Sequence, residues 1–269
     1  MNISEKYSPT DKALAKHIEY YWHVDHSHTL FHNIETIYSY PGITPELIIP
    51  IEGQLQLTYG GKDYHIQDSL LSTVMPQNAV LNFSALRAFI FVRFKRHALA
   101  SLLPFVPQSA DELMENALLM AEDVFGDAIH QLQRKLQVAE FHNRYELVDE
   151  WLFARLNRDR EGFVLDVMQA AGQAYNLKAM LQQTNYSYST VERLFKKETG
   201  LTPKKYLVFK RFKSCVEQLL TSRDTDWSDY IGTYGYYDQS HFIKEVKKFT
   251  GYAPTQLLQL PSLPTYRPA

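Results

Sequence analysis

The sequence contains a single cysteine, Cys215, among 269 residues. One thiol excludes an intramolecular disulfide and any zinc or iron–sulfur site that needs several cysteines. There is no apolar run long enough for a transmembrane helix, and the N-terminal residues MNISEKYSPTDK lack the apolar stretch of a signal peptide. These absences favour a cytoplasmic protein in a reducing compartment.

Motifs of the common enzyme classes are also missing. The sequence has no nucleophile elbow of the Gly-x-Ser-x-Gly type, no phosphate-binding loop and no dinucleotide-binding glycine pattern. A loose suggestion of a metal site comes from His26, His28, His32 and Glu35. This stretch precedes the strand and glycine pattern that a metal-binding barrel needs, so surface histidines are the preferred interpretation. We therefore expect no enzymatic activity, no metal and no cofactor.

What the sequence does contain is an uneven distribution of charge. The formal net charge is only −2, from 28 Lys and Arg against 30 Asp and Glu. Residues 1–160 carry 14 basic and 20 acidic side chains, whereas residues 161–269 carry 14 basic and 10 acidic ones. A basic half in an otherwise balanced protein indicates a polyanionic partner for that half.

The first half has the pattern of a β-rich domain with helices at both ends. Residues 8–22 are predicted to form a short helix, because capping residues precede apolar residues at helical spacing. Short β-branched or aromatic runs, typical of strands, follow at residues 34–40, 46–51, 54–59 and 87–94. Gly60-Gly61 indicates a hairpin after the third of these runs. Further helices are predicted over residues 96–103, 111–119, 121–139 and 141–157.

A polar segment at residues 157–162 marks a domain boundary. The chain beyond it reads as helical throughout, without an alternating run long enough for a strand. The sequence thus predicts an α+β protein of two domains. Residues 1–160 would form a β-barrel or β-sandwich followed by helices, and residues 161–269 an all-α domain.

The all-α half repeats itself. Each copy reads as a helix, a tight turn, a second helix and a Gly-x-x-Pro element, and we align Ser187 of the first copy with Ser240 of the second. Asn185 and Gly235 tolerate the left-handed backbone that the two turns require. Ser187 and Asp238 are suited to cap the helices that follow.

The second helix of each copy is amphipathic, over about residues 188–198 and 239–249. Its apolar side consists of Val191, Leu194 and Phe195 in one copy and of Phe242, Val246 and Phe249 in the other. The opposite side carries polar and cationic groups. A helix that is anchored by one face and presents such groups on the other suits the major groove of DNA.

Together these elements resemble the AraC/XylS family of transcription regulators. The matching residues are the run Ser-x-x-x-Val-x-Arg-x-Phe-Lys-Lys-x-x-Gly-x-x-Pro-x-x-Tyr at 187–206, Lys210-Arg211-Phe212, Gly-Tyr-x-Asp-x-Ser-x-Phe at 235–242 and Gly-x-x-Pro at 251–254. The resemblance implies a double helix-turn-helix domain whose units are joined by a long helix, here about residues 203–220. Its two recognition helices would read adjacent major grooves.

By the same resemblance, two sets of side chains would contact DNA. Base reading would fall to Ser189, Glu192, Arg193, Gln239, His241 and Lys244. Phosphate contacts would fall to Ser187, Lys196, Lys197, Ser240, Lys247 and Lys248. Arg193 would bind guanine edges and Gln239 adenine, whereas the lysines would add affinity and salt dependence.

Five positions depart from the family pattern. Leu181 and Ile231 stand where alanine is frequent, Ser189 where a long side chain is common, and Tyr236 and Val246 replace phenylalanine. Such changes in packing leave an alternative open. The protein would then be a ligand-sensing or protein-interaction module whose degenerate motif does not bind DNA alone.

The first half has a weaker resemblance, to a β-rich domain in front of some AraC-type DNA-binding domains. It is carried by Tyr20-Tyr21-Trp22, the run 41–48 and Phe91-Val92-Arg93-Phe94, and it implies effector sensing or dimerisation. Glu46 and Arg93 are either a structural ion pair or side chains that orient a polar effector. The expected partners are double-stranded DNA, a small-molecule effector, RNA polymerase if the protein is an activator, and a second copy of the chain, with no membrane.

Overall fold

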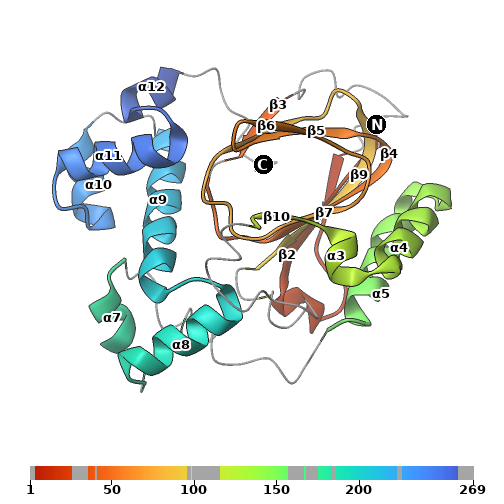
Figure 1. Ribbon diagram of the computed structural model, residues 1–269, viewed down its shortest axis with the longest axis horizontal. Coiled ribbons are helices and arrows are strands. Elements are labelled where there is room, and N and C mark those ends of the chain that lie inside the picture. The colour runs from red at the N-terminus through yellow and green to blue at the C-terminus, as the bar shows by residue number, and fades with distance from the viewer. Residues whose placement is uncertain are drawn as a thin grey trace.

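The computed structural model describes residues 4–25, 36–39, 41–95, 98, 116–156, 167, 175–182, 184, 186–222 and 226–259. The β-rich part contains two antiparallel sheets (Figure 1). The strands of the first sheet, in spatial order, are β1 (Ser4–Tyr7), β2 (Ile18–Asp25), β9 (Leu86–Phe94), β4 (Glu46–Gly53), β7 (Leu70–Ser72) and β10 (Leu118–Met120). Those of the second are β3 (Thr36–Ser39), β8 (Ala79–Asn82), β5 (Leu55–Tyr59) and β6 (Lys62–Ile66).

The two sheets form a sandwich, which settles the choice between barrel and sandwich. Strand β9 shows why, because its apolar residues point alternately to two separate cores. Phe89 and Phe91 lie in the core that the two sheets share. Ile90 and Val92 lie in a second core, on the other face of the first sheet.

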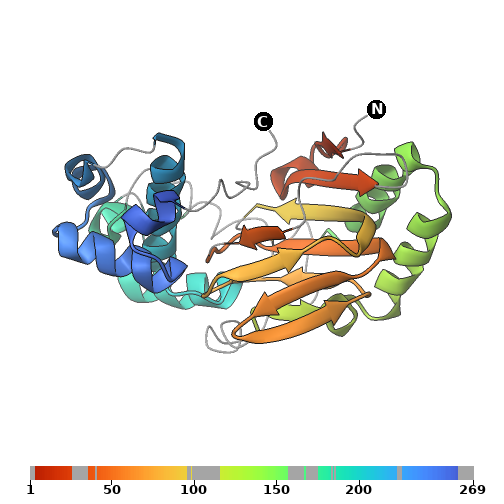
Figure 2. The same cartoon turned by 90° about the horizontal axis from the view of Figure 1, so that it is seen from above.

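Helices cover that other face. They are α3 (Ala121–Phe125), α4 (Asp127–Val138) and α5 (Arg144–Phe153), and α5 follows the 3-10 turn η3 (Phe141–Asn143). Ile129 and Leu132 of α4 and Leu152 of α5 are buried in the second core. Figure 2 shows α4 and α5 at the end of the molecule opposite the C-terminal helices.

Three helix predictions for this part differ from the structure. Residues 8–22 contain only the 3-10 turn η1 (Leu14–Lys16), and β2 starts at Ile18. The residues that give the apparent helical spacing are buried for other reasons: Leu14 and Ile18 lie in the helix-facing core, and Tyr21 faces it from a strand. The predicted helix over 111–119 ends in β10, which pairs with β7. The predicted helix over 121–139 is interrupted at Gly126.

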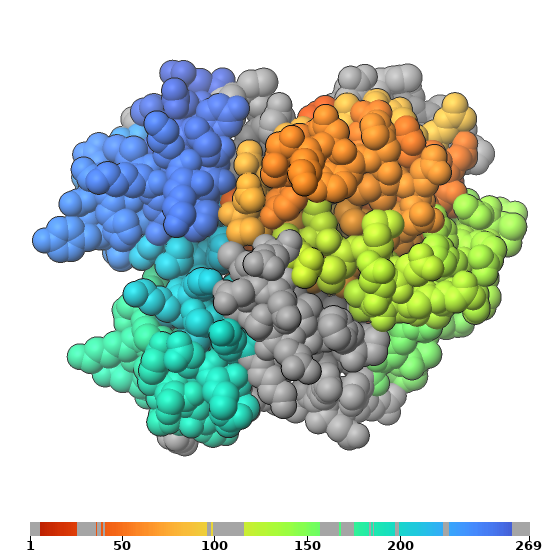
Figure 3. All heavy atoms as spheres, in the orientation of Figure 1, coloured from red at the N-terminus to blue at the C-terminus, as the bar shows by residue number. Residues whose placement is uncertain are grey.

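The C-terminal part is helical throughout its described residues. Its helices are α7 (Leu177–Gln182), α8 (Tyr188–Thr199), α9 (Pro203–Ser222), α10 (Trp227–Tyr234), α11 (Gln239–Thr250) and α12 (Pro254–Gln259). They share one core, which also includes Ile43 and Val74 from the β-rich part. The two parts therefore pack directly against each other, as Figure 3 also shows. None of the helices in the described residues has both the length and the apolarity to cross a membrane.

Candidate nucleic-acid interface

The C-terminal helices form two helix-turn-helix units on one connecting helix. The first unit is α7 with α8, and the second is α10 with α11. Figure 1 shows α9 between them, with α8 at one end and α10 and α11 at the other. The predicted recognition helices and the predicted connecting helix are thus present within a few residues of their expected bounds.

Side-chain caps fix where each second helix begins. The Ser187 hydroxyl accepts a hydrogen bond from the Thr190 backbone N–H at 3.3 Å. The Asp238 carboxylate accepts one from the His241 N–H at 2.7 Å. Gly235 ends α10 with φ 69°, in the left-handed region that a residue with a side chain adopts only at a cost. Asn185, the corresponding turn residue of the first unit, lies outside the described residues.

The structure corrects the register between the two units. Each second helix has 12 residues between its caps, from Ser187 to Gly200 and from Asp238 to Gly251. Ser187 therefore corresponds to Asp238 and not to Ser240. A buried threonine confirms this register, because the hydroxyls of Thr199 and Thr250 donate to the carbonyl four residues earlier in both units.

The predicted base-reading side chains lie on the solvent side of the two helices. Ser189, Arg193, Gln239 and Lys244 are exposed, and Glu192 and His241 are half-buried. In the corrected register Arg193 corresponds to Lys244 and Ser189 to Ser240. The opposite faces are closed, with Val191, Phe195, Phe242 and Val246 fully buried. Leu194, which was expected on the apolar face, is only half-buried.

The predicted phosphate contacts are less uniform. Ser240, Lys247 and Lys248 are exposed, whereas Lys196 is half-buried. The Ser187 hydroxyl is already engaged as a helix cap. The side chain of Lys197 lies outside the described part of the chain.

The repeat points to two further residues that the sequence interpretation omitted. Tyr188 corresponds to Gln239, and Thr190 corresponds to His241, because the caps coincide. Tyr188 is 41% exposed, and its hydroxyl donates to the Glu192 carboxylate at 2.9 Å. Aligning the two units by their Gly-x-x-Pro elements alone finds both residues.

The departures from the family pattern are accommodated by packing. Leu181 and Ile231 are partly buried against the shared helical core, and Val246 is fully buried in it. The ring of Tyr236 packs edge-on against Phe242 at 5.3 Å between centroids. Cys215 is buried in the same core, and burial raises the pKa of its thiol to about 12.

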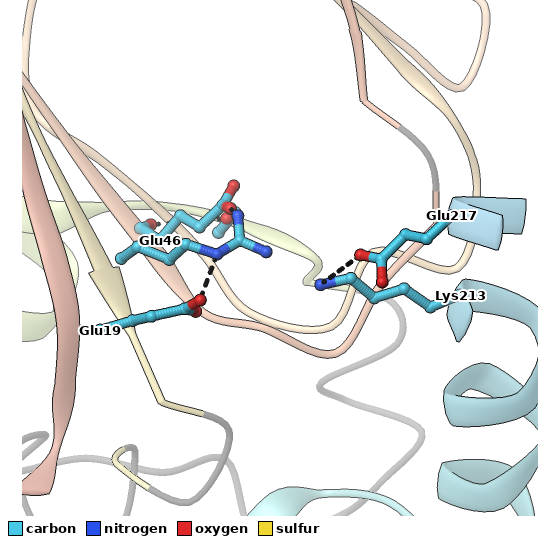
Figure 4. A network of polar contacts seen from close by, with 6 residues as sticks. Glu19, Glu46, Lys213 and Glu217 are labelled. Carbon is cyan, nitrogen blue, oxygen red and sulfur yellow. Dashed lines mark hydrogen bonds and ion pairs between the residues drawn. The ribbon is translucent and has the colours of Figure 1, made fainter. Parts of the chain in front are cut away.

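Glu46 and Arg93, the predicted effector-binding residues, form an ion pair with each other. Glu19 also accepts from the Arg93 Nε at 3.1 Å. Figure 4 shows Lys213 of α9 facing this group, with Glu217 3.8 Å from its ammonium nitrogen. Burial raises the pKa of the Glu46 carboxyl, although Arg93 and Lys213 act in the opposite direction.

No cluster of three or more His, Cys, Asp or Glu side chains suited to a metal occurs in the described residues. The suspected cluster at His26, His28, His32 and Glu35 lies outside them.

Two amphipathic, capped helices on one connecting helix define the class of a double helix-turn-helix domain. Residues 180–259 match the family model described as a helix-turn-helix domain. This match confirms the resemblance of the C-terminal half to AraC-type helix-turn-helix domains, which occur in DNA-binding transcription regulators.

No curated protein matches the chain significantly. Similar solved structures include ToxT from Vibrio cholerae O395, with 12% identity and a TM-score of 0.38, covering 91% of this chain and 97% of that one. ToxT from the same strain bound to (E)-4-(8-methylnaphthalen-1-yl)but-3-enoic acid has 10% identity and a TM-score of 0.40, covering 84% and 97%. Unsaturated fatty acid bound wild-type ToxT from Vibrio cholerae strain SCE256 has 12% identity and a TM-score of 0.37, covering 88% and 93%.

Proposed function

We propose that the protein is a sequence-specific transcription regulator that reads DNA through α8 and α11. One observation carries the proposal: Arg193 and Lys244 occupy the same position on two recognition helices that one connecting helix holds. Both side chains are exposed, opposite a fully buried apolar face. Two equivalent cationic helices in one chain suit two successive major grooves of one duplex.

The test is a selection from a random duplex pool, followed by titration of the selected DNA with the full-length chain. We expect binding that weakens steeply as salt rises, because Lys and Arg displace counterions from phosphates. Arg193→Ala and Lys244→Ala should each weaken binding by about 1–3 kcal/mol and relax the preference at a different group of base pairs.

Matched controls are available on α4, at the opposite end of the molecule from α11 (Figure 1). Arg134 and Lys135 are exposed there. Arg134→Ala and Lys135→Ala each remove a side chain of the same type but leave α8 and α11 unchanged. DNA binding by these variants should therefore equal that of the wild type. Equal losses of DNA binding in all four variants would show that the protein binds DNA only by nonspecific electrostatic attraction. A folded wild-type chain that selects no DNA would favour the interaction module instead.

We further propose that residues 1–160 act as a sensor or self-association domain and residues 161–269 as the DNA-binding domain. The arrangement of Glu46 and Arg93 supports a polar effector site, because these charged side chains are only 19% and 13% exposed and Lys213 of α9 acts electrostatically on Glu46. Polar groups that converge in a largely closed site orient ligands.

An unsaturated fatty acid, the ligand class named for one ToxT structure, is one probe for this site. We expect the probe to raise the melting temperature of the wild-type chain and to have a smaller effect on Arg93→Met. A matched arginine variant, Arg87→Met, removes an exposed guanidinium paired with Glu52 and should respond like the wild type. Equal shifts in melting temperature for all three proteins would show that the fatty acid does not bind at Arg93.

A further inference from the structure

The second recognition helix has a buried carboxylate on its inward side. Leu194 of α8 corresponds to Glu245 of α11 in the register that the caps set. The Glu245 side chain is only 9% exposed. A buried carboxylate is unfavourable unless it is paired and hydrogen-bonded, and a leucine fills the equivalent place in the first unit.

The partner of this carboxylate comes from the connecting helix. The Arg211 guanidinium of α9 donates through Nε to Glu245 Oε1 at 3.0 Å and also contacts Oε2 through Nη2. This two-point contact fixes the plane of the carboxylate and hence the rotation of α11 against α9. The Arg211 guanidinium also lies 4.6 Å from the centre of the Tyr236 ring, which precedes α11.

The other neighbour of Glu245 is a predicted base-reading side chain. His241 Nδ1 accepts a hydrogen bond from the Tyr237 backbone N–H at 3.3 Å. The neutral ring therefore carries its hydrogen on Nε2, which lies 3.8 Å from Glu245 Oε2. The ring also packs edge-on against Tyr236 at 5.3 Å. Its side chain is nevertheless 41% exposed, so it remains accessible to a base.

We propose that Arg211 and Glu245 are positioning residues that fix the orientation of the half-exposed His241 ring and thereby set the base preference of α11. Arg211 holds the Glu245 carboxylate, the carboxylate faces Nε2, and the Tyr237 N–H holds Nδ1. The inference rests on the proposed DNA-binding function. The Arg211–Glu245 pair would influence base specificity only in the second unit, because the first unit has Leu194, without a carboxylate, in place of Glu245.

The experiment compares base preferences of full-length variants on the DNA that the wild-type chain selects. Arg193→Ala and Lys244→Ala first assign each base pair to α8 or to α11. Glu245→Gln should then lower the preference at α11 base pairs by about fivefold, the lower end of what a base contact provides. Preferences at α8 base pairs should be unchanged. Glu150→Gln, which removes an exposed carboxylate from α5, should leave both groups unchanged.

A double-mutant cycle separates positioning from a general structural effect. If Glu245 acts through His241, then Glu245→Gln should cause no further loss of preference once His241→Ala is present. Additive losses, or an equal loss of affinity at every base pair, would overturn the inference.

Folding is checked by thermal melting. If Glu245→Gln proves unfolded, the pair Arg211→Met with Glu245→Leu removes both buried charges and restores the apolar character of the first unit. This double variant should fold and show the same loss of preference at α11 base pairs. A wild-type chain that selects no DNA contradicts the proposed function, whereas a normal selection with unchanged preferences in the folded variants contradicts only this inference.

Discussion

At the scale of single residues, buried polar groups join segments that are distant in the sequence. Asp149 of α5 is the clearest case in the β-rich part. Its carboxylate accepts from the Tyr21 hydroxyl at 2.7 Å and from the Thr10 hydroxyl at 2.6 Å. The Tyr21 contact attaches a covering helix to the first sheet, and the Thr10 contact attaches the chain between β1 and η1.

We expect Asp149→Ala to destabilise the protein by about 2–4 kcal/mol, because it leaves two buried or partly buried hydroxyls without their acceptor. The measurement is the free energy of unfolding in urea. Glu150→Ala, one residue further along the same helix and exposed, is the control and should change stability by no more than about 0.5 kcal/mol. Similar losses in both variants would show that the carboxylate of Asp149 has no special role.

Because the side chain of His23 is buried, we expect the stability of the protein to depend on pH. The pKa of this residue is lowered to about 3, first by burial and then by the nearby Arg144 guanidinium. The folded state thus keeps His23 neutral at pH values where the unfolded chain, with an ordinary pKa of about 6.5, takes up a proton. The contribution of the neutral His23 side chain to the free energy of unfolding is therefore complete above about pH 6.5. It decreases as the pH falls toward about 3, by up to about 1.4 kcal/mol per pH unit.

The comparison is between wild type and His23→Gln, with the free energy of unfolding measured from pH 4 to 7. We expect the variant to be less stable at pH 7 but to lose less stability on acidification. His65→Gln, at an exposed position on β6, should keep the wild-type slope. The same slope in His23→Gln would contradict this account.

Few of these residue contacts could be predicted from the sequence. The sequence predicts the Glu46–Arg93 ion pair as one of two alternatives, because both charges lie next to apolar runs. Arg211 and Glu245 are 34 residues apart in sequence and meet only because α9 packs on α11. No local pattern marks such a pair.

At the scale of elements, prediction succeeded where capping chemistry marks a boundary. Ser187 and Asp238 begin α8 and α11 as expected, and Gly235 ends α10. Prediction failed over residues 8–22, where polar capping residues precede a strand. The eight residues of β2 lie between β1 and β9, so pairing on both sides outweighs weak helical spacing.

The caps themselves can be tested through Asp238. Asp238→Ala should destabilise the protein by about 0.5–2 kcal/mol, because the His241 N–H loses its acceptor at the start of α11. Asp238→Asn keeps a side-chain oxygen at this position and should retain most of the stability. The measurement is the midpoint of urea unfolding. Equal losses in both variants would mean that the charge and not the cap is important.

At the scale of the whole molecule, the connecting helix contacts both the recognition helices and the β-rich part. Lys213 of α9 acts electrostatically on Glu46 and lies 3.8 Å from Glu217, while Ile43 and Val74 extend the helical core into the β-rich part. The helix that orients α8 and α11 is therefore the helix through which a change in the β-rich part would reach them.

Calorimetry tests this coupling. We expect wild type to unfold in one transition and Lys213→Gln with Val74→Ser to unfold in two, because the double variant weakens both the charged and the apolar contact between the parts. Lys204→Gln, at an exposed position near the start of α9, is the matched control and should keep one transition. A single unchanged transition in the double variant would contradict coupling through α9.

The sequence by itself determined the helix-turn-helix repeat, because turn glycines, caps and a helical apolar period act within a few residues of one another. It also determined the β-rich character of the first half, through alternating strands such as β5 and its hairpin to β6. Only the tertiary structure decided that the sheets form a sandwich, that β2 is a strand, and that Glu245 and Lys213 find their partners on other elements. These features depend on contacts between residues far apart in the chain. Local sequence patterns do not show how favourable such contacts are.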